Sequence, residues 1–169
     1  SDNRILNLTP FEVKFNENRQ FFTEGTELFN KGDLFYSKRI GSIPSYYDYS
    51  GVGSDKIVKD QTEAKVLNAT KISGRTAKGL GIGIFNAVTK GMETEVEDVQ
   101  GNLRMVETQP LTNYNILVFD QSLKNNSSAT FINTNVLRQG SAYDANVSAA
   151  LFNFNDKKNT YFIDGAGKM

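Results

Sequence analysis

The chain has 169 residues, which is enough for one domain with its own hydrophobic core. Only 38% of the residues are hydrophobic, and no stretch approaches the roughly 20 consecutive apolar residues of a membrane-spanning helix, which excludes a helical membrane protein. The 19 basic and 19 acidic residues are well mixed, so the sequence lacks the clustered basic surface of a nucleic-acid-binding protein.

The sequence contains neither cysteine nor histidine. Disulfides and thiol chemistry are therefore excluded, and the usual general base and the commonest transition-metal ligand are missing. Because no catalytic motif is recognisable among the other residue types, we predict a protein that is not an enzyme and that holds no cofactor or metal.

Residues 1–62 are predicted to form an irregular segment that packs on a sheet built by residues 63–169. Within this segment, residues 11–15 alternate like one short strand, and residues 44–55 have the Pro, Gly, Ser and Asp content of an exposed loop. The first residues lack the basic region and long apolar run of a signal peptide. We therefore expect either a cytosolic protein or the interior of a longer exported chain.

Six short segments with strand-like patterns follow, and they predict a mainly β protein. The connections between them are short at 76–78 and 156–158 and longest at 90–111. Since so few residues leave no room for a crossover, both short connections predict antiparallel hairpins. The predicted strands are 63–75, 79–89, 112–121, 128–138, 143–155 and 159–167.

The segment 79–89 shows the clearest separation into two faces. Leu80, Ile82 and Ile84 share one face, while Gly81 and Gly83 lie on the other. This pattern predicts that the first face meets a large apolar phase. On the second face, small residues predict close approach by other backbone or by the N-terminal segment.

The predicted architecture is an antiparallel meander of about six strands, forming a partial β-barrel or an open twisted sheet. Strands of about 9–11 residues, joined by tight turns at one end and longer loops at the other, are typical of outer-membrane barrels. Such barrels need at least eight strands. We therefore expect a piece of a longer chain. Its open sheet edges pair with another copy or with the N-terminal segment, or else the piece closes as a small soluble sheet.

Two groups of residues in the N-terminal segment are candidates for a functional role. Glu24 and Glu27 lie among aromatic residues and form the closest pair of candidate catalytic carboxylates, but we interpret them as part of a structural charge cluster with Lys38 and Arg39. A second group has three aromatic rings that suit stacking on a sugar, a membrane interface or simple loop packing. Its members are Tyr46, Tyr47 and Tyr49.

Two apparent ligand-binding motifs do not meet the requirements of their classes. The stretch 74–79 begins like a phosphate-binding loop, but Leu80 and Gly81 stand where Lys and Ser or Thr must follow, so we predict a hairpin turn. The oxygen-bearing side chains between Asp48 and Asp55 lack the spacing and the terminal Glu of an EF-hand calcium loop.

Several stretches of the chain, taken in order, resemble a family of large Gram-negative surface proteins of unassigned function. In that family, a family-9-type carbohydrate-binding module precedes a C-terminal outer-membrane β-barrel domain. The resemblance implies that this chain is the opening part of the barrel domain, and it carries over no catalytic residues. The stretches are 15–29, 34–41, 69–76, 79–89, 110–114 and 161–165.

The leading functional prediction is a non-enzymatic segment of an outer-membrane β-barrel domain, located at the surface of a Gram-negative bacterium and linked to glycan binding or uptake. The glycan partner follows from the resemblance alone. The second hypothesis is a soluble β-sandwich or barrel-like module that binds carbohydrate through the tyrosine-rich loop. The third hypothesis is a carboxylate-based glycan hydrolase using Glu24 and Glu27.

Overall fold

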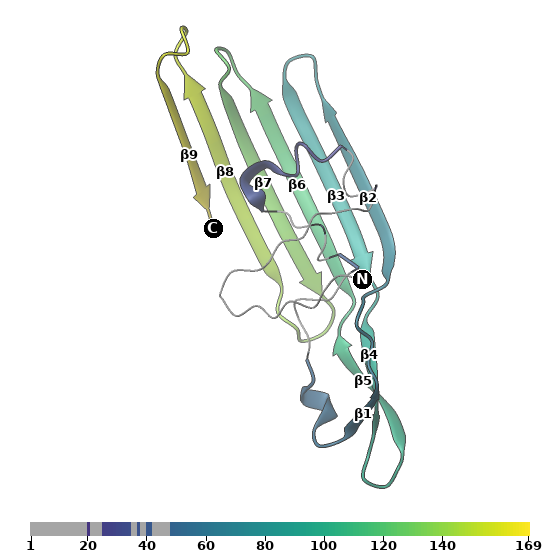
Figure 1. Ribbon diagram of the computed structural model, residues 1–169. Coiled ribbons are helices and arrows are strands. Elements are labelled where there is room, and N and C mark those ends of the chain that lie inside the picture. The colour runs from purple at the N-terminus through teal and green to yellow at the C-terminus, as the bar shows by residue number, and fades with distance from the viewer. Residues whose placement is uncertain (1–19, 21–24, 35–36, 38–39, 42–47) are drawn as a thin grey trace.

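The computed structural model describes residues 20, 25–34, 37, 40–41 and 48–169. These residues form two antiparallel sheets of six and three strands, together with short 3-10 helices that include η1 (Lys31–Asp33) and η3 (Ser50–Val52) (Figure 1). No helix in this part of the chain is long and apolar enough to cross a membrane.

The larger sheet is a meander in which each strand pairs with the next one in the order β2-β3-β6-β7-β8-β9. All of its pairings are antiparallel, and β2 and β9 form its two edges. The sheet is therefore open, which confirms the predicted mainly β, six-stranded antiparallel meander. Its strands are β2 (Val66–Arg75), β3 (Leu80–Thr89), β6 (Thr112–Ser122), β7 (Ser128–Arg138), β8 (Ala145–Asn155) and β9 (Phe162–Lys168).

The smaller sheet was not predicted. It consists of β1 (Lys56–Lys59), β4 (Met92–Glu97) and β5 (Leu103–Gln109), in the order β1-β4-β5. Treating 90–111 as a loop and all of 1–62 as irregular was therefore wrong. The hairpin of β4 and β5 extends beyond one end of the larger sheet (Figure 1).

The tight turns of the larger sheet lie at the opposite end. At the first turn, the Gly79 backbone N–H donates to the Thr76 carbonyl over 2.9 Å, and Gly79 adopts a φ of +83°, which glycine tolerates without strain. At the last turn, the Asp156 carboxylate accepts a hydrogen bond from the Thr160 backbone N–H at 2.6 Å. Both predicted antiparallel hairpins are confirmed.

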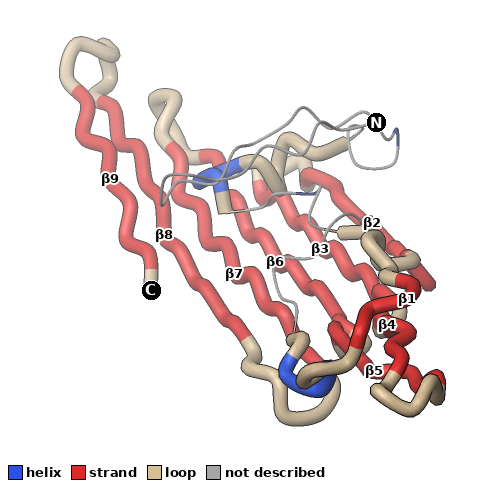
Figure 2. Tube along the Cα trace, turned by 60° about the horizontal axis from the view of Figure 1, so that its bottom comes forward, coloured by secondary structure: helices blue, strands red, loops and turns tan. Residues whose placement is uncertain are grey.

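One face of the larger sheet is covered by residues from the N-terminal segment, and we call it the covered face (Figure 2). Leu28, Phe29 and Ile40 are almost fully buried there against the sheet. Phe29 meets Phe85 of β3 edge-on, with ring centroids 6.2 Å apart. The sheet contributes Phe85, Ala87, Ile116, Val118 and Ile132 to this core.

The glycines of β3 make this close packing possible. A Cβ atom on Gly81 would lie 3.0 Å from the Leu28 side chain, and one on Gly83 would lie 3.1 Å from the Phe29 ring. The close approach predicted from these two glycines is therefore made by the N-terminal segment.

We expect Gly83→Ala to lower the free energy of unfolding by about 1–3 kcal/mol, because the added methyl group overpacks the site of the fully buried Phe29 ring. Gly74→Ala on neighbouring β2 is the matched control, since a Cβ atom added to Gly74 would have no heavy atom within 4 Å. Urea unfolding of both variants tests this prediction, and equal destabilisation by the two would contradict it.

The N-terminal segment also connects the two ends of the sheet. Leu28 packs beside Gly81, close to the tight-turn end, and Gly32 lies beside Leu151 and Ile132 near the middle of the strands. Further along the chain, β1 pairs with β4 in the projecting hairpin. The described parts of the segment thus lead from the tight-turn end to the hairpin end.

Candidate functional site

A buried charge cluster lies on the covered face around Asp120 of β6. The Asp120 side chain is 1% exposed and accepts hydrogen bonds from Lys31 Nζ at 2.5 Å and from Thr130 Oγ1 at 2.6 Å. Arg75 Nη2 of β2 donates to its other carboxylate oxygen. The cluster therefore joins the N-terminal segment to three strands of the larger sheet.

The environment of Asp120 favours its charged form. Burial raises the pKa of its carboxyl group, but hydrogen bonds from Lys31, Thr130 and Arg75 outweigh this effect and lower the pKa from 3.8 to about 2. The Arg75 guanidinium also donates to the Gly79 carbonyl and to Ser122 Oγ, so it is held in place at the tight-turn end. The arrangement has the features of a structural anchor.

The lowered pKa predicts how this anchor responds to acid. A carboxyl group with a depressed pKa in the folded state stabilises the fold fully above its unfolded-state pKa, here 3.8, and loses that contribution as the pH falls towards 2. We expect about 2 kcal/mol to be lost over this range. The measurement is the difference in unfolding free energy between the wild type and Asp120→Asn at several pH values, and a difference independent of pH would contradict it.

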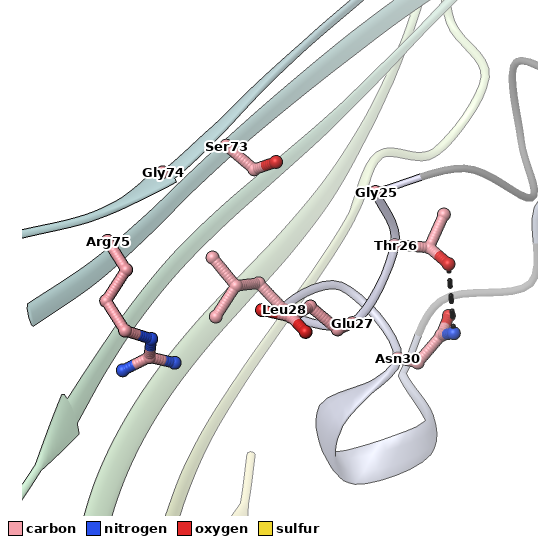
Figure 3. Close-up of a pocket in the computed structure, with 8 residues that line it drawn as sticks. All are labelled: Gly25, Thr26, Glu27, Leu28, Asn30, Ser73, Gly74 and Arg75. Atoms are coloured by element: carbon pink, nitrogen blue, oxygen red, sulfur yellow. Dashed lines mark hydrogen bonds between the residues drawn. The ribbon is translucent and has the colours of Figure 1, made fainter. Parts of the chain in front are cut away.

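A pocket of about 560 Å³ lies between residues 25–30 and the edge strand β2 (Figure 3). Its polar groups include Glu27, Ser73 and Arg75, but both terminal guanidinium nitrogens of Arg75 already donate to protein oxygens. The charge of the Arg75 guanidinium is therefore already paired with the Asp120 carboxylate. The position of the pocket beside an unpaired strand edge is also where a neighbouring strand would sit.

The other face of the larger sheet, which we call the open face, has an unusual composition. The strand registers assign every ionisable side chain of the six strands, all of which the structure describes, to the covered face. In a sheet with one face in water, charges lie on the exposed face and apolar residues on the covered one. The charged residues on the covered face are Lys71, Arg75, Asp120, Arg138, Asp164 and Lys168.

The open face instead carries exposed aliphatic and aromatic side chains, which we call the apolar band. Most of them are between 36% and 69% exposed. Two of its rings, Phe152 and Phe154, stack with centroids 5.4 Å apart. The band consists of Ile72, Ile82, Ile84, Leu117, Phe119, Phe131, Phe152, Phe154 and Ile163.

The apolar band crosses the strands obliquely. The row of directly paired residues that starts at Ile72 of β2 and Ile84 of β3 reaches β8 at Ser148. At the other end of the band, Ile163 of β9 pairs with Phe154, which lies six residues further along β8. Six residues at about 3.3 Å each, across five strand spacings of about 4.8 Å, correspond to an angle of roughly 40°. Within the sheet, the strand axes are therefore tilted by this angle from the direction perpendicular to the band.

A row of hydrogen-bonded amides, which we call the asparagine ladder, adjoins the apolar band on the open face. Asn86 Nδ2 donates to Asn113 Oδ1 at 2.7 Å and to Asn115 Oδ1 at 2.8 Å, and Asn115 Nδ2 donates to Asn135 Oδ1 at 3.3 Å. Asn133 Nδ2 donates to Asn146 Oδ1 and Ser148 Oγ, both at 2.9 Å. The ladder thus spans β3, β6, β7 and β8.

Most of the residues singled out from the sequence lie outside the described residues. This applies to Glu24, Lys38 and Arg39 of the predicted charge cluster, to Tyr46 and Tyr47, and to the short strand predicted at 11–15. Glu27 is exposed and lines the pocket at β2. Tyr49 is 37% exposed, and its hydroxyl donates to the Asp60 carboxylate over 3.1 Å.

The oxygen-bearing residues near position 50 make ordinary structural contacts. Asp48 accepts a hydrogen bond from the Ser50 backbone N–H at 2.8 Å, and Asp55 forms an ion pair with Arg104 at 2.6 Å. Within the described residues, no three or more Asp or Glu side chains gather as metal ligands would.

These features define an open antiparallel β-sheet domain whose ionisable strand residues all lie on the face that carries the N-terminal segment, while the opposite face is uncharged. The whole chain, residues 1–169, matches the family described as a domain of unknown function (DUF5916), and the protein belongs to this family. No curated protein and no solved structure matched the chain.

Proposed function

We propose that this chain forms part of the wall of an outer-membrane β-barrel of a Gram-negative bacterium and has no enzymatic role. In this proposal, the open face meets lipid and the covered face meets the barrel interior. The observation that carries it is the distribution of charge, since every ionisable strand residue of the larger sheet lies on the covered face. Lipid-facing positions exclude charge, and interior positions accept it.

Strand length and tilt support the same arrangement. Five of the strands in the larger sheet contain 10 or 11 residues. A transmembrane β-strand needs about 9–11 residues at a tilt near 45°, and the tilt inferred from the apolar band is roughly 40°.

The two ends of the sheet suggest its direction in the membrane. Bacterial barrels have short turns on the periplasmic side and longer loops outside the cell. The tight turns would then be periplasmic, and the hairpin of β4 and β5 would be extracellular. Further strands beside β2 and β9, from the same gene product or from another copy, would close the barrel, because open edges are not tolerated in lipid.

We further propose that the barrel serves the binding or uptake of glycans or their products. The resemblance to surface proteins with an upstream carbohydrate-binding module supports this part of the proposal.

The test compares single cysteine substitutions at two adjacent positions of the same strand, and it does so on two strands. The variants are made in the gene product as its host produces it. The chain itself has no native cysteine to interfere. Ile72→Cys and Ile163→Cys lie on the open face, and Ser73→Cys and Asp164→Cys are their matched controls on the covered face. Each variant is labelled with an environment-sensitive fluorophore and exposed to spin-labelled lipids in isolated outer membranes.

We expect lipid quenching at positions 72 and 163 and little or none at 73 and 164. Equal quenching at neighbouring positions would overturn the assignment of the open face to lipid. Recovery of the protein in the soluble fraction would overturn the whole proposal and would favour the soluble carbohydrate-binding module.

A further inference from the structure

The asparagine ladder ends with unused hydrogen-bond donors on the open face. Asn113, Asn135 and Asn146 each accept a ladder bond through Oδ1, while the Nδ2 group of each donates to no group among the described residues. These amides are therefore fixed in orientation and still able to donate to a ligand.

The ladder occupies a defined place between two other surfaces. Along β3, the open face reads Ile82, Ile84, Asn86 and half-buried Val88, and exposed Lys90 follows where the strand ends. Lys65 lies beside Lys90, because the Lys90 backbone N–H donates to the Lys65 carbonyl at 2.8 Å. Lys65 is also exposed. In the direction of the β4–β5 hairpin, the surface thus changes from the apolar band to the asparagine ladder, and two lysines follow beyond Val88 and Leu137 at the end of the sheet.

This order matches the order of chemical groups in an anionic glycolipid. Its acyl chains suit the apolar band, its sugar hydroxyls suit neutral amide donors and acceptors, and its negative groups suit lysine. A phospholipid would offer acyl chains and a phosphate but no row of hydroxyl groups for the ladder. We propose that the asparagine ladder binds the sugar head group of an outer-leaflet glycolipid. This inference rests on the proposed membrane orientation, in which the hairpin end lies outside the cell.

The ladder geometry allows a substitution that removes the donors and keeps the ladder. In the triple variant Asn113→Asp, Asn135→Asp and Asn146→Asp, a carboxylate oxygen still accepts each ladder bond, but the spare N–H donors are replaced by negative charge. Asn68→Asp is the matched control, because Asn68 lies on the open face of β2 and makes no ladder contact.

The experiment reconstitutes the gene product in phosphatidylcholine vesicles and follows its thermal unfolding as purified lipopolysaccharide is added. Lipopolysaccharide should raise the unfolding midpoint of the wild type and of Asn68→Asp. In the triple variant, we expect the half-saturating concentration to rise at least tenfold, which corresponds to about 1.4 kcal/mol. The midpoint without lipopolysaccharide reports separately on whether the triple variant remains folded.

Each alternative outcome has a distinct meaning. An unchanged half-saturating concentration in a folded triple variant would overturn the glycolipid site and leave the proposed barrel intact. Equal stabilisation by the oligosaccharide released from lipopolysaccharide, which lacks acyl chains, would also overturn a site that needs both the ladder and the apolar band. Failure of the wild type to enter vesicles would count against the barrel itself.

Discussion

Asp120→Asn is expected to lower the free energy of unfolding by about 3 kcal/mol at neutral pH, the low end of the cost of breaking a buried ion pair. The substitution keeps the shape of the side chain and removes the charge that Lys31 and Arg75 share. We choose the low end because both cations are about one-third exposed and can still reach water. Chemical unfolding measures this loss directly.

Two further variants separate the anchor from a general effect of charge. Lys31→Met removes the ion pair between the N-terminal segment and β6, and combining it with Asp120→Asn should cost less than the sum of the two single losses. Asp164→Asn is the control, since Asp164 lies on the same face but is exposed. Strictly additive losses for Lys31 and Asp120, or an equal loss in the control, would contradict the role of the cluster.

The six-stranded sheet was predictable because its strands alternate and its turns are short. In β3, for example, the alternation of Gly81 and Gly83 with Ile82 and Ile84 distinguishes the two faces of the strand by residue type alone. The register that joins the six strands was not predictable, because it depends on where each turn closes. Only the register shows that all ionisable strand residues share one face.

The smaller sheet has a sequence signal of its own that is easily misread. Residues 92–97 alternate strictly, and Met92, Thr94 and Val96 are buried while Glu93 is exposed. Glutamate is uncommon in strands, and so the segment resembles a charged loop. Strand β1 has only four residues, all of them exposed, and its pairing depends on β4, which lies far away in the sequence.

The anchor at Asp120 was missed for a related reason. Asp120 follows the apolar run 116–119 and falls on the same face as Ile116 and Val118, so a charge at a core position was visible in the pattern. Its partners Lys31 and Arg75 come from distant parts of the chain, and no local spacing connects them.

Phe131→Arg tests the proposed environment of the open face with one substitution whose effect depends on the surroundings. In a membrane, an arginine in the apolar band should destabilise the inserted barrel by about 2–4 kcal/mol if this position lies near the bilayer midplane. In water, Phe131 is already 44% exposed, so the same change should alter stability by no more than about 0.5 kcal/mol.

Leu137→Arg provides the matched control on the same strand and the same face. Leu137 is 42% exposed and lies beyond the asparagine ladder, where β7 ends and a membrane interface is expected. Near an interface, arginine costs only about 0–1 kcal/mol. Unfolding by urea in lipid vesicles should therefore rank Phe131→Arg well below Leu137→Arg in stability. Equal stability of the two variants would place the open face in water, because only a lipid environment makes the cost of a charge depend on depth.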